Sequence, residues 1–170
     1  CSSDLATGAV EFKPIGMYGY EKYDRVLTQV DLERVLQSGK AAMDKFFKPQ
    51  RVAMIQCVGS REDKPPRAYC SRVCCMYAVK QARQLKEKHP EIDVRIFYID
   101  IRAFGKGFED LYKRARQEGV LFVRGLPTEV IENKKTHDLW LTGENTLLHE
   151  IYKNKVGMVI LSTGLQPRQD

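Results

Sequence analysis

The chain has 170 residues with a formal net charge of +6, and 43% of its residues are hydrophobic. This composition is typical of one globular domain with its own core, and no apolar run approaches the roughly 18 residues of a membrane-spanning helix. Basic residues alternate with acidic ones, as in Lys86-Glu87-Lys88. The positive charge therefore indicates a solvated surface, and we expect neither a nucleic-acid partner nor a transmembrane segment.

Early elements of the chain can be predicted from its turn residues and apolar runs. Residues 12–23, rich in Gly, Pro and Tyr, predict a loop. A capping-box pattern predicts a helix over residues 28–37, and residues 38–50 are typical of a linker. The apolar run at 52–55 then predicts a buried strand, followed by a loop over 58–69.

The second half of the chain alternates between helical and strand patterns. We expect a helix over 71–88, a strand over 93–101, a helix over 108–117 and a strand over 120–123. Further strands are expected near residues 128–132, 138–142, 147–152 and 156–162. The first three of these predict a small antiparallel set, and the last predicts a buried strand.

This alternation predicts an α/β fold with a doubly wound parallel sheet, similar to dinucleotide-binding domains. Such sheets bind dinucleotides at the carboxyl ends of their strands, on a glycine-rich loop. Here Gly59 is the only glycine in the loop that follows the first strand, and Cys57 and Cys70 flank that loop. We infer that a metal-binding loop replaces the nucleotide-binding loop.

Five cysteines are present, and four of them fall within one short stretch, at Cys57, Cys70, Cys74 and Cys75. This clustering differs from the spread pattern of a secreted disulfide framework, so we expect a reducing, cytoplasmic setting. Because the chain starts at Cys1 without an initiator Met, a lipidated amino terminus is one interpretation. The interior cysteines favour the other, a piece cut from a longer protein.

The spacing of the four cysteines favours an iron–sulfur cluster. Zinc ribbons usually supply two separated pairs of ligands, and adjacent helical residues such as Cys74 and Cys75 point about 100° apart. A cluster is wider than one ion, its irons are separate targets for thiolates, and a helix amino end favours its negative charge. A structural zinc site remains an alternative, as does a redox disulfide or a set of free thiols.

Lys80 and Asp100 are two further candidates. Lys80 shares a largely apolar face of the predicted helix with Val73, Met76 and Tyr77. Its stem could snorkel over that surface, or its ammonium could be a buried cation beside a redox cofactor, where it stabilises an anionic reduced form or passes a proton. Asp100 follows the second strand, where dinucleotide folds often keep an acid for ribose; without the glycine loop we favour a structural role.

Two similar tripeptides, Ala6-Thr7-Gly8 and Ser162-Thr163-Gly164, flank the predicted sheet. In flavoproteins built from two dinucleotide folds, such segments close the FAD-binding half on both sides of an inserted domain. We therefore divide the chain into 1–50 (FAD-domain edge and linker), 51–155 (inserted Rossmann-like domain with the cysteines) and 156–170 (return strand).

The chain resembles the A subunit of heterodisulfide reductase in three segments: IQCVGSR at 55–61, YCSRVCCMYAVKQA at 69–82 and FYIDIRAFGKG at 97–107. The resemblance covers most of residues 5–168, and relatives include flavoprotein subunits of quinone-interacting membrane-bound oxidoreductase complexes. It implies a thioredoxin-reductase-like oxidoreductase that carries FAD and a 4Fe-4S cluster. The first glycine-rich FAD loop and the ferredoxin-like cysteine motifs are absent, so the chain resembles a central piece of that protein.

The resemblance also implies roles for individual residues. It carries the cluster-ligand role onto Cys57, Cys70, Cys74 and Cys75, and a catalytic, flavin-proximal role onto Lys80. Contacts with FAD in the full-length protein are implied for Thr7, Gly8, Thr163 and Gly164. The implied partners are other iron–sulfur subunits of a heterodisulfide-reductase-like complex, with a hydrogenase or a ferredoxin as candidates, and some relatives perform flavin-based electron bifurcation.

Two other classes of function remain open at this point. A zinc-stabilised interaction module would use the same cysteines for structure alone. An NAD(P)H-binding oxidoreductase domain would need nucleotide affinity without the usual glycines.

Overall fold

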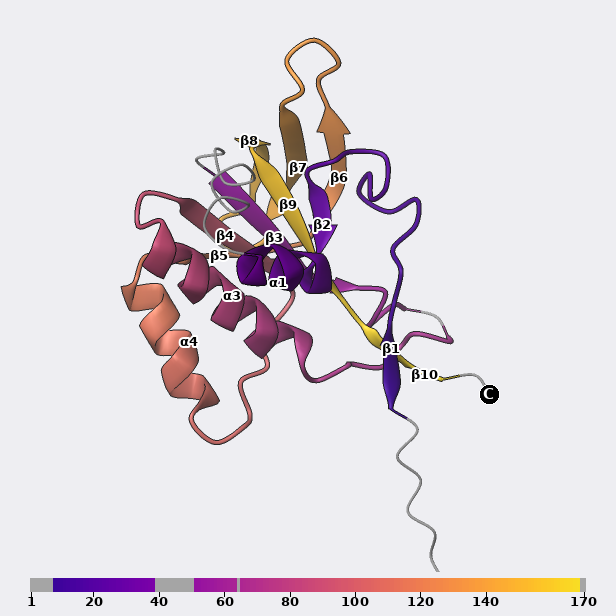
Figure 1. Cartoon of the computed structure of the whole chain (residues 1–170), viewed down its shortest axis with the longest axis vertical. Coiled ribbons are helices and arrows are strands. Elements are labelled where there is room, and N and C mark those ends of the chain that lie inside the picture. The colour runs from indigo at the N-terminus through magenta and orange to yellow at the C-terminus, as the bar shows by residue number, and fades with distance from the viewer. Residues whose placement is uncertain (1–7, 39–50, 64, 169–170) are drawn as a thin grey trace, which may run out of the picture.

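The computed structural model describes residues 8–38, 51–63 and 65–168. Its centre is a five-stranded sheet with the strand order β2-β9-β3-β4-β5 (Figure 1). The strands are β2 (Val26–Thr28), β9 (Met158–Thr163), β3 (Arg51–Val58), β4 (Asp93–Tyr98) and β5 (Leu121–Arg124). All neighbouring pairs are parallel, so the carboxyl ends of the five strands lie at one end of the sheet.

Three helices pack on one face of this sheet: α1 (Gln29–Gln37), α3 (Cys74–Lys88) and α4 (Phe108–Gln117) (Figure 1). Their apolar sides form a core with residues of the strands. This core includes Leu32, Leu85 and Ala115 of the helices and Ile96 and Ile160 of the strands. This burial accounts for the helices, because each has an apolar face at the spacing that a helix requires.

An antiparallel sheet covers the opposite face. It consists of β6 (Pro127–Glu132), β7 (Leu139–Asn145) and β8 (Glu150–Val156). A second core lies between the two sheets, where Phe97 and Ile55 contact the cluster that contains Leu139 and Leu141. Since both faces of the parallel sheet are buried, its central strands are almost wholly apolar.

The segments before and after the parallel sheet lie side by side. Strand β1 (Ala9–Glu11) pairs with β10 (Leu165–Pro167) in antiparallel register, below the carboxyl end of the sheet (Figure 1). The amide of Phe12 also donates to the carbonyl of Gly164 at 2.8 Å. The two ends of the described chain therefore leave the sheet together.

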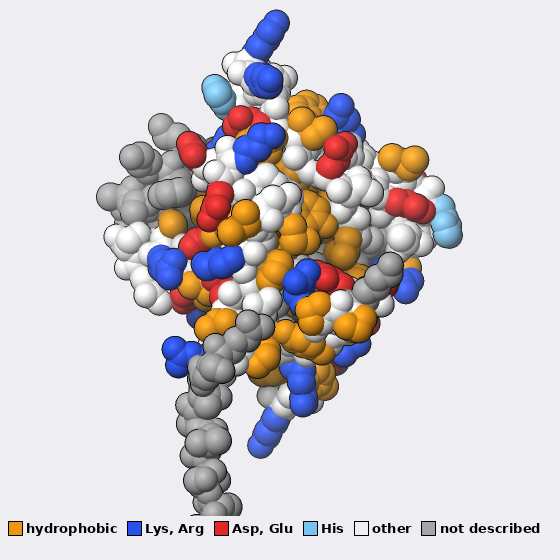
Figure 2. Space-filling view, turned by 90° about the vertical axis from the view of Figure 1, so that its right-hand side faces the viewer, with side chains coloured by type: hydrophobic (Ala, Val, Ile, Leu, Met, Phe, Trp, Pro, Cys, Tyr) orange, Lys and Arg blue, Asp and Glu red, His pale blue; other side chains and the backbone are white. Residues whose placement is uncertain are grey.

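The predicted loop at 12–23 packs against the second core through its aromatic side chains. Tyr18, Tyr20 and Tyr23 are partly buried there. The hydroxyl of Tyr18 donates to the carbonyl of Pro127 at the start of β6, and a hollow of about 500 Å³ is lined by this loop and by Thr128–Val130 of β6. Figure 2, which views this side of the molecule, shows hydrophobic side chains gathered across its middle.

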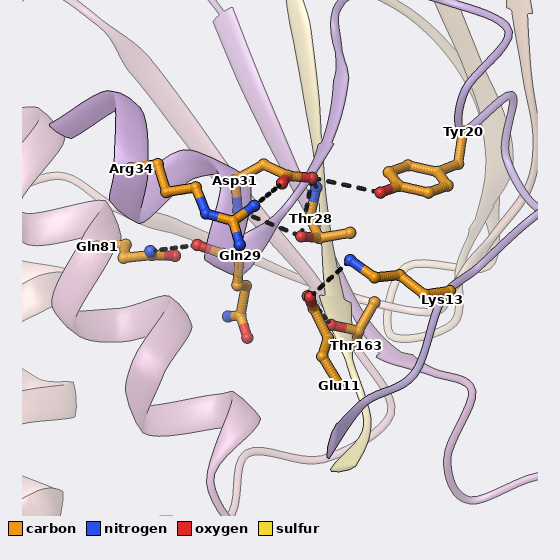
Figure 3. Close-up of polar contacts among 9 residues, drawn as sticks. All are labelled: Glu11, Lys13, Tyr20, Thr28, Gln29, Asp31, Arg34, Gln81 and Thr163. Carbon is orange, nitrogen blue, oxygen red and sulfur yellow. Dashed lines mark hydrogen bonds and ion pairs between the residues drawn. The ribbon is translucent and has the colours of Figure 1, made fainter. Parts of the chain in front are cut away.

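Most predicted elements are confirmed. The parallel α/β sheet, the antiparallel set and the bounds of α4 agree with expectation. Helix α1 carries the predicted capping box, in which the hydroxyl of Thr28 accepts from the amide of Asp31 at 3.3 Å and the carboxylate of Asp31 accepts from the amide of Thr28 at 3.1 Å (Figure 3). The predicted linker lies almost entirely outside the described residues.

Two boundaries were wrong. Helix α3 begins at Cys74, not at residue 71, because Arg72 has a φ of 65°, which lies outside the right-handed helical region. Cys70 therefore does not share a helical face with Cys74. Strand β4 ends at Tyr98 instead of continuing to residue 101, because its neighbour β5 ends opposite it.

Candidate functional site

Four cysteines meet at the carboxyl end of the parallel sheet. Cys57 lies near the end of β3, Cys70 lies in the following loop, and Cys74 and Cys75 are the first residues of α3. All four are free thiols; Cys70 is partly exposed and the other three are buried. Cys57 interacts electrostatically with both Cys70 and Cys75, so residues 13 to 18 positions apart in sequence are neighbours in space.

The backbone around these cysteines adopts unusual conformations. Cys57, Gly59 and Arg61 all have left-handed φ values, of 61°, 70° and 56°. Val58 and Ser60 do not, so the sign of φ alternates from residue to residue between Cys57 and Arg61. Turns of this kind aim backbone amides into concavities that hold anions, iron–sulfur centres among them, and non-glycine residues at positive φ are concentrated at functional sites.

Hydrogen-bond donors surround the sulfur atoms. The amide of Arg72 donates to Cys70 Sγ at 3.3 Å. Hydrogen bonding from the backbone of Arg102 favours the charged form of Cys75 and lowers its pKa, and the charge and hydrogen bonding of the Arg61 guanidinium act in the same direction on the pKa of Cys57. Donors of this kind stabilise negatively charged sulfur, the form in which cysteine binds metals.

The thiols do not titrate alike. Burial raises the pKa of Cys57 to about 11, against the opposing effect of Arg61. In the adjacent pair, a hydrogen bond between the two side chains lowers the pKa of Cys75 and raises that of Cys74. Burying thiols beside one another is unfavourable for their deprotonation unless a cation compensates the charge.

An ion pair fixes the loop that follows Cys57. Arg61 binds Asp100 through two hydrogen bonds, of 2.6 and 3.0 Å, and Arg102 reaches the same carboxylate at 3.3 Å. Burial raises the pKa of Asp100, but the bonds from Arg61 outweigh this effect and lower it overall. The spacing of the cysteines did not reveal Arg61, although it follows Cys57 by only four residues.

The donor set fits an iron–sulfur cluster. Within residues 8–38, 51–63 and 65–168, no group of three or more His, Cys, Asp or Glu side chains is arranged as the ligands of one metal ion. The four thiols are nonetheless neighbours, since Cys74 interacts electrostatically with Cys57, Cys70 and Cys75. A four-iron cluster takes one thiolate on each iron, and four neighbouring thiols supply that number.

Lys80 lies beside this site on α3 and forms an ion pair with Glu33 of α1 at 3.1 Å. Its side chain is 49% exposed in the described structure, and its role as a cation beside a redox cofactor stays a prediction. Gln81 donates to Glu33 at 3.1 Å. It also donates to the carbonyl of Gln29 at 2.8 Å, a bond that Figure 3 shows. Gln29 in turn donates to the carbonyl of Cys74, and this buried network therefore ties α1 to the first turn of α3.

The residues expected near FAD lie on the connecting segments. Thr7 is outside the described residues, and Gly8 is exposed. The hydroxyl of Thr163 donates to Glu11 at 2.8 Å, and Glu11 also binds Lys13 (Figure 3). The amide of Gly164 donates to the carbonyl of Val58. These bonds join β1 to β9 and the residue after β9 to the end of β3, which carries Cys57.

The sequence was compared with curated proteins. It is 44% identical over 158 residues to an A-type iron-sulfur subunit of CoB–CoM heterodisulfide reductase from Methanopyrus kandleri, a match that covers 89% of this chain and 24% of that protein. The chain is homologous to a segment of the A subunit of heterodisulfide reductase. A second relative, the A subunit of the H2:CoB-CoM heterodisulfide, ferredoxin reductase of Methanothermobacter marburgensis, is 44% identical over 174 residues, covering 96% of this chain and 26% of that protein.

The resemblance inferred from the sequence is thus confirmed, and the chain spans about a quarter of the length of the heterodisulfide reductase subunits that it matches. No protein-family profile matches it. Among solved structures, thioredoxin reductase from Lactococcus lactis has a TM-score of 0.58 and 20% identity, over 95% of this chain and 44% of that one. This likeness confirms the thioredoxin-reductase-like fold. In the described part of the chain, no helix is long and apolar enough to cross a bilayer.

Proposed function

We propose that this chain is an electron-transfer module of a heterodisulfide-reductase-type oxidoreductase, in which Cys57, Cys70, Cys74 and Cys75 hold one 4Fe-4S cluster. The observation that carries this proposal is the meeting of four free thiols at the carboxyl end of a parallel sheet. Homology to proteins named as iron-sulfur subunits supports it.

Each part of the site has a distinct task in this proposal. When bound, the cluster supplies one-electron transfer. The four thiolates bind it, the amides of Arg72 and Arg102 hydrogen-bond to sulfur, and the cores on both faces of the sheet exclude water. The amino end of α3 points its unpaired amides toward the same negative charge.

We further propose that FAD lies close to this site in a longer protein, where it would supply two-electron chemistry. Lys80 would lie near the flavin, and its half-exposed ammonium suits contact with an anionic group. Thr7, Gly8, Thr163 and Gly164 would shape the FAD side of the connecting segments. The pairing of β1 with β10 supports this division, because an inserted domain must leave and return at adjacent points.

The partners in this proposal are other iron–sulfur subunits of a heterodisulfide-reductase-like complex in the cytoplasm. Names of the relatives include H2 and ferredoxin as reactants, which supports a hydrogenase or a ferredoxin as electron donor or acceptor. Flavin-based electron bifurcation is the proposed activity of the full complex.

The test is anaerobic purification of the chain, reconstitution with iron and sulfide, and measurement of iron, zinc, sulfide and the reduced-state EPR spectrum. About four irons and four sulfides per chain are expected, with a cluster signal. Cys74→Ser should remove the signal and most of the iron, whereas Cys1→Ser, outside the group of four, should not. One zinc per chain without a signal would instead support a structural metal site.

The role of Lys80 needs a protein that binds flavin. In the full-length protein, Lys80→Met should shift the flavin potentials and leave the iron content unchanged, because a positive charge near the flavin is lost. Lys113→Met, on the exposed side of α4, is the matched control. Flavin potentials that match the control would assign Lys80 to its ion pair with Glu33 alone.

A further inference from the structure

Two Arg–Asp–Arg groups occupy opposite ends of the strand pair β3–β4. At the carboxyl end, Asp100 binds Arg61 and Arg102. At the amino end, Asp93 binds Arg51 at 2.7 Å and Arg95 at 2.8 Å. The chemistry of the two groups is the same, and only the first contacts a cysteine.

We propose that Arg61, held by Asp100, is a positioning residue that sets the reduction potential of the metal centre at Cys57. The inference rests on the function proposed above. It assigns the carboxyl-end group a task beyond joining two loops: the guanidinium raises the potential, and the carboxylate moderates that effect.

The geometry holds the guanidinium in one place. Two parallel bonds to Asp100 orient the plane of Arg61, as is typical of arginine–carboxylate pairs. The amide of Arg61 also donates to the carbonyl of Tyr69 at 2.9 Å, next to Cys70. The charge is therefore anchored through both its backbone and its side chain, between the segments that carry two of the thiols.

The position of the charge gives the direction of its effect. Adding an electron to a thiolate-bound cluster makes the site more negative, so a nearby cation stabilises the reduced form more than the oxidised form. Only 19% of the Arg61 side chain is exposed, so water and salt screen it weakly. Asp100 acts in the opposite direction, and Arg102 offsets part of its charge.

The test is a redox titration of the reconstituted chain, followed by its EPR signal. Arg61→Gln removes the cation and a donor to Cys57, so the midpoint potential should become more negative. Asp100→Asn keeps an oxygen that accepts from Arg61 but removes the negative charge, so the midpoint potential should become more positive. Two members of one ion pair then shift the potential in opposite directions, which a loss of structure alone would not produce.

The amino-end group provides matched controls. Arg51→Gln and Asp93→Asn break the same kind of ion pair at a distance of about 20 Å, seven residues along an extended strand and beyond the Debye length. Both should lower the temperature of unfolding and leave the potential unchanged. If Arg61→Gln takes up no iron, Arg61→Lys replaces it, with a smaller negative shift expected because the charge remains.

The outcomes separate the inference from the function on which it rests. Wild-type chain that takes up no cluster would overturn both. Normal cluster content with potentials that match the controls would overturn the inference alone. Shifts in the same direction for the Arg61 and Asp100 variants would also overturn it, because they would indicate a shared structural effect.

Discussion

The two ends of the parallel sheet differ in backbone conformation more than in composition. Both hold an aspartate between two arginines, one contributed by the β3 side and one located two residues after the aspartate. At the amino end this group joins regular strands. At the carboxyl end it lies among left-handed residues and four thiols. The same ion-pair chemistry thus supports structure at one end and a candidate reactive site at the other.

The reason lies in how parallel sheets are connected. Strands of this kind deliver helix amino ends and long loops to their carboxyl end, and ligands of such folds bind there. In this chain, α3 begins at that end with Cys74 and follows a loop of fifteen residues after β3. Three of the seven non-glycine residues at positive φ in the described chain, Cys57, Arg61 and Arg72, lie at this end.

The largest expected effect on stability comes from the strand pair β3–β4, which runs between the two Arg–Asp–Arg groups. Phe97 is fully buried between the two sheets and stacks at 5.4 Å from the ring of Tyr152. Phe97→Ala should lower the free energy of unfolding by about 3–5 kcal/mol, through lost burial and a cavity. Urea denaturation measures this, with Phe97→Leu as a milder control, and a loss under about 1 kcal/mol would contradict the two-core architecture.

The next largest effect is expected at the carboxyl end of the sheet, where a substitution should change both stability and iron uptake. A Cβ at Gly164 would lie 2.9 Å from the carbonyl oxygen of Gly59 and 3.0 Å from the hydroxyl of Ser71. Gly164→Ala should therefore cost about 1–3 kcal/mol of unfolding free energy and lower iron uptake, because both neighbours lie on the cysteine-bearing segments.

Gly107→Ala is its control. Gly107 has a φ of 78° with open space around it, so the substitution should destabilise through backbone strain of about 1–2 kcal/mol and leave iron uptake unchanged. Equal loss of iron in the two variants would show that uptake follows overall stability.

A smaller effect is expected at the amino end. Asp93→Asn removes one charge from bonds to Arg51 and Arg95 and should lower the free energy of unfolding by about 1 kcal/mol at neutral pH. Thermal unfolding measures this change. A full loss of folding would contradict the view that this ion pair only joins two strands.

The pH dependence of that effect sharpens the comparison. Burial raises the pKa of Asp93, but hydrogen bonds from Arg95 and Arg51 outweigh it and lower the pKa in the folded state. The stabilisation is therefore present above the unfolded pKa, about 3.9, and is lost as pH falls through the folded value. The gap in stability between wild type and Asp93→Asn should close below about pH 4, and a gap that widens there would contradict this assignment.

Sequence patterns were informative where an element is long or carries a local signal. The capping box at Thr28 and Asp31 led to a correct helix, and the bounds predicted for α4, which is followed closely by Gly119, were also correct. Strands β1, β2 and β10 were missed, because three residues are too few to show a period. The start of α3 was misplaced, because nothing in the residues next to Arg72 predicts that Arg72 adopts a left-handed conformation.

For the candidate site, the four cysteines and their place after the first long strand were visible in the sequence. Cys74 and Cys75 were expected in the first turns of a helix, and they are the first two residues of α3. What could not be predicted is which charges lie beside them. Glu33 is 47 residues from Lys80, and Asp100 is 39 residues from Arg61.

The sequence by itself determined the longer elements and the residue types available for chemistry, because hydrophobic period, caps and cysteine spacing are local properties of a chain. Only the tertiary structure decided how those residues are paired. Parallel strands bring distant segments to the same end of the sheet, and burial there makes each ion pair and each hydrogen bond to sulfur depend on neighbours that the sequence does not place next to one another.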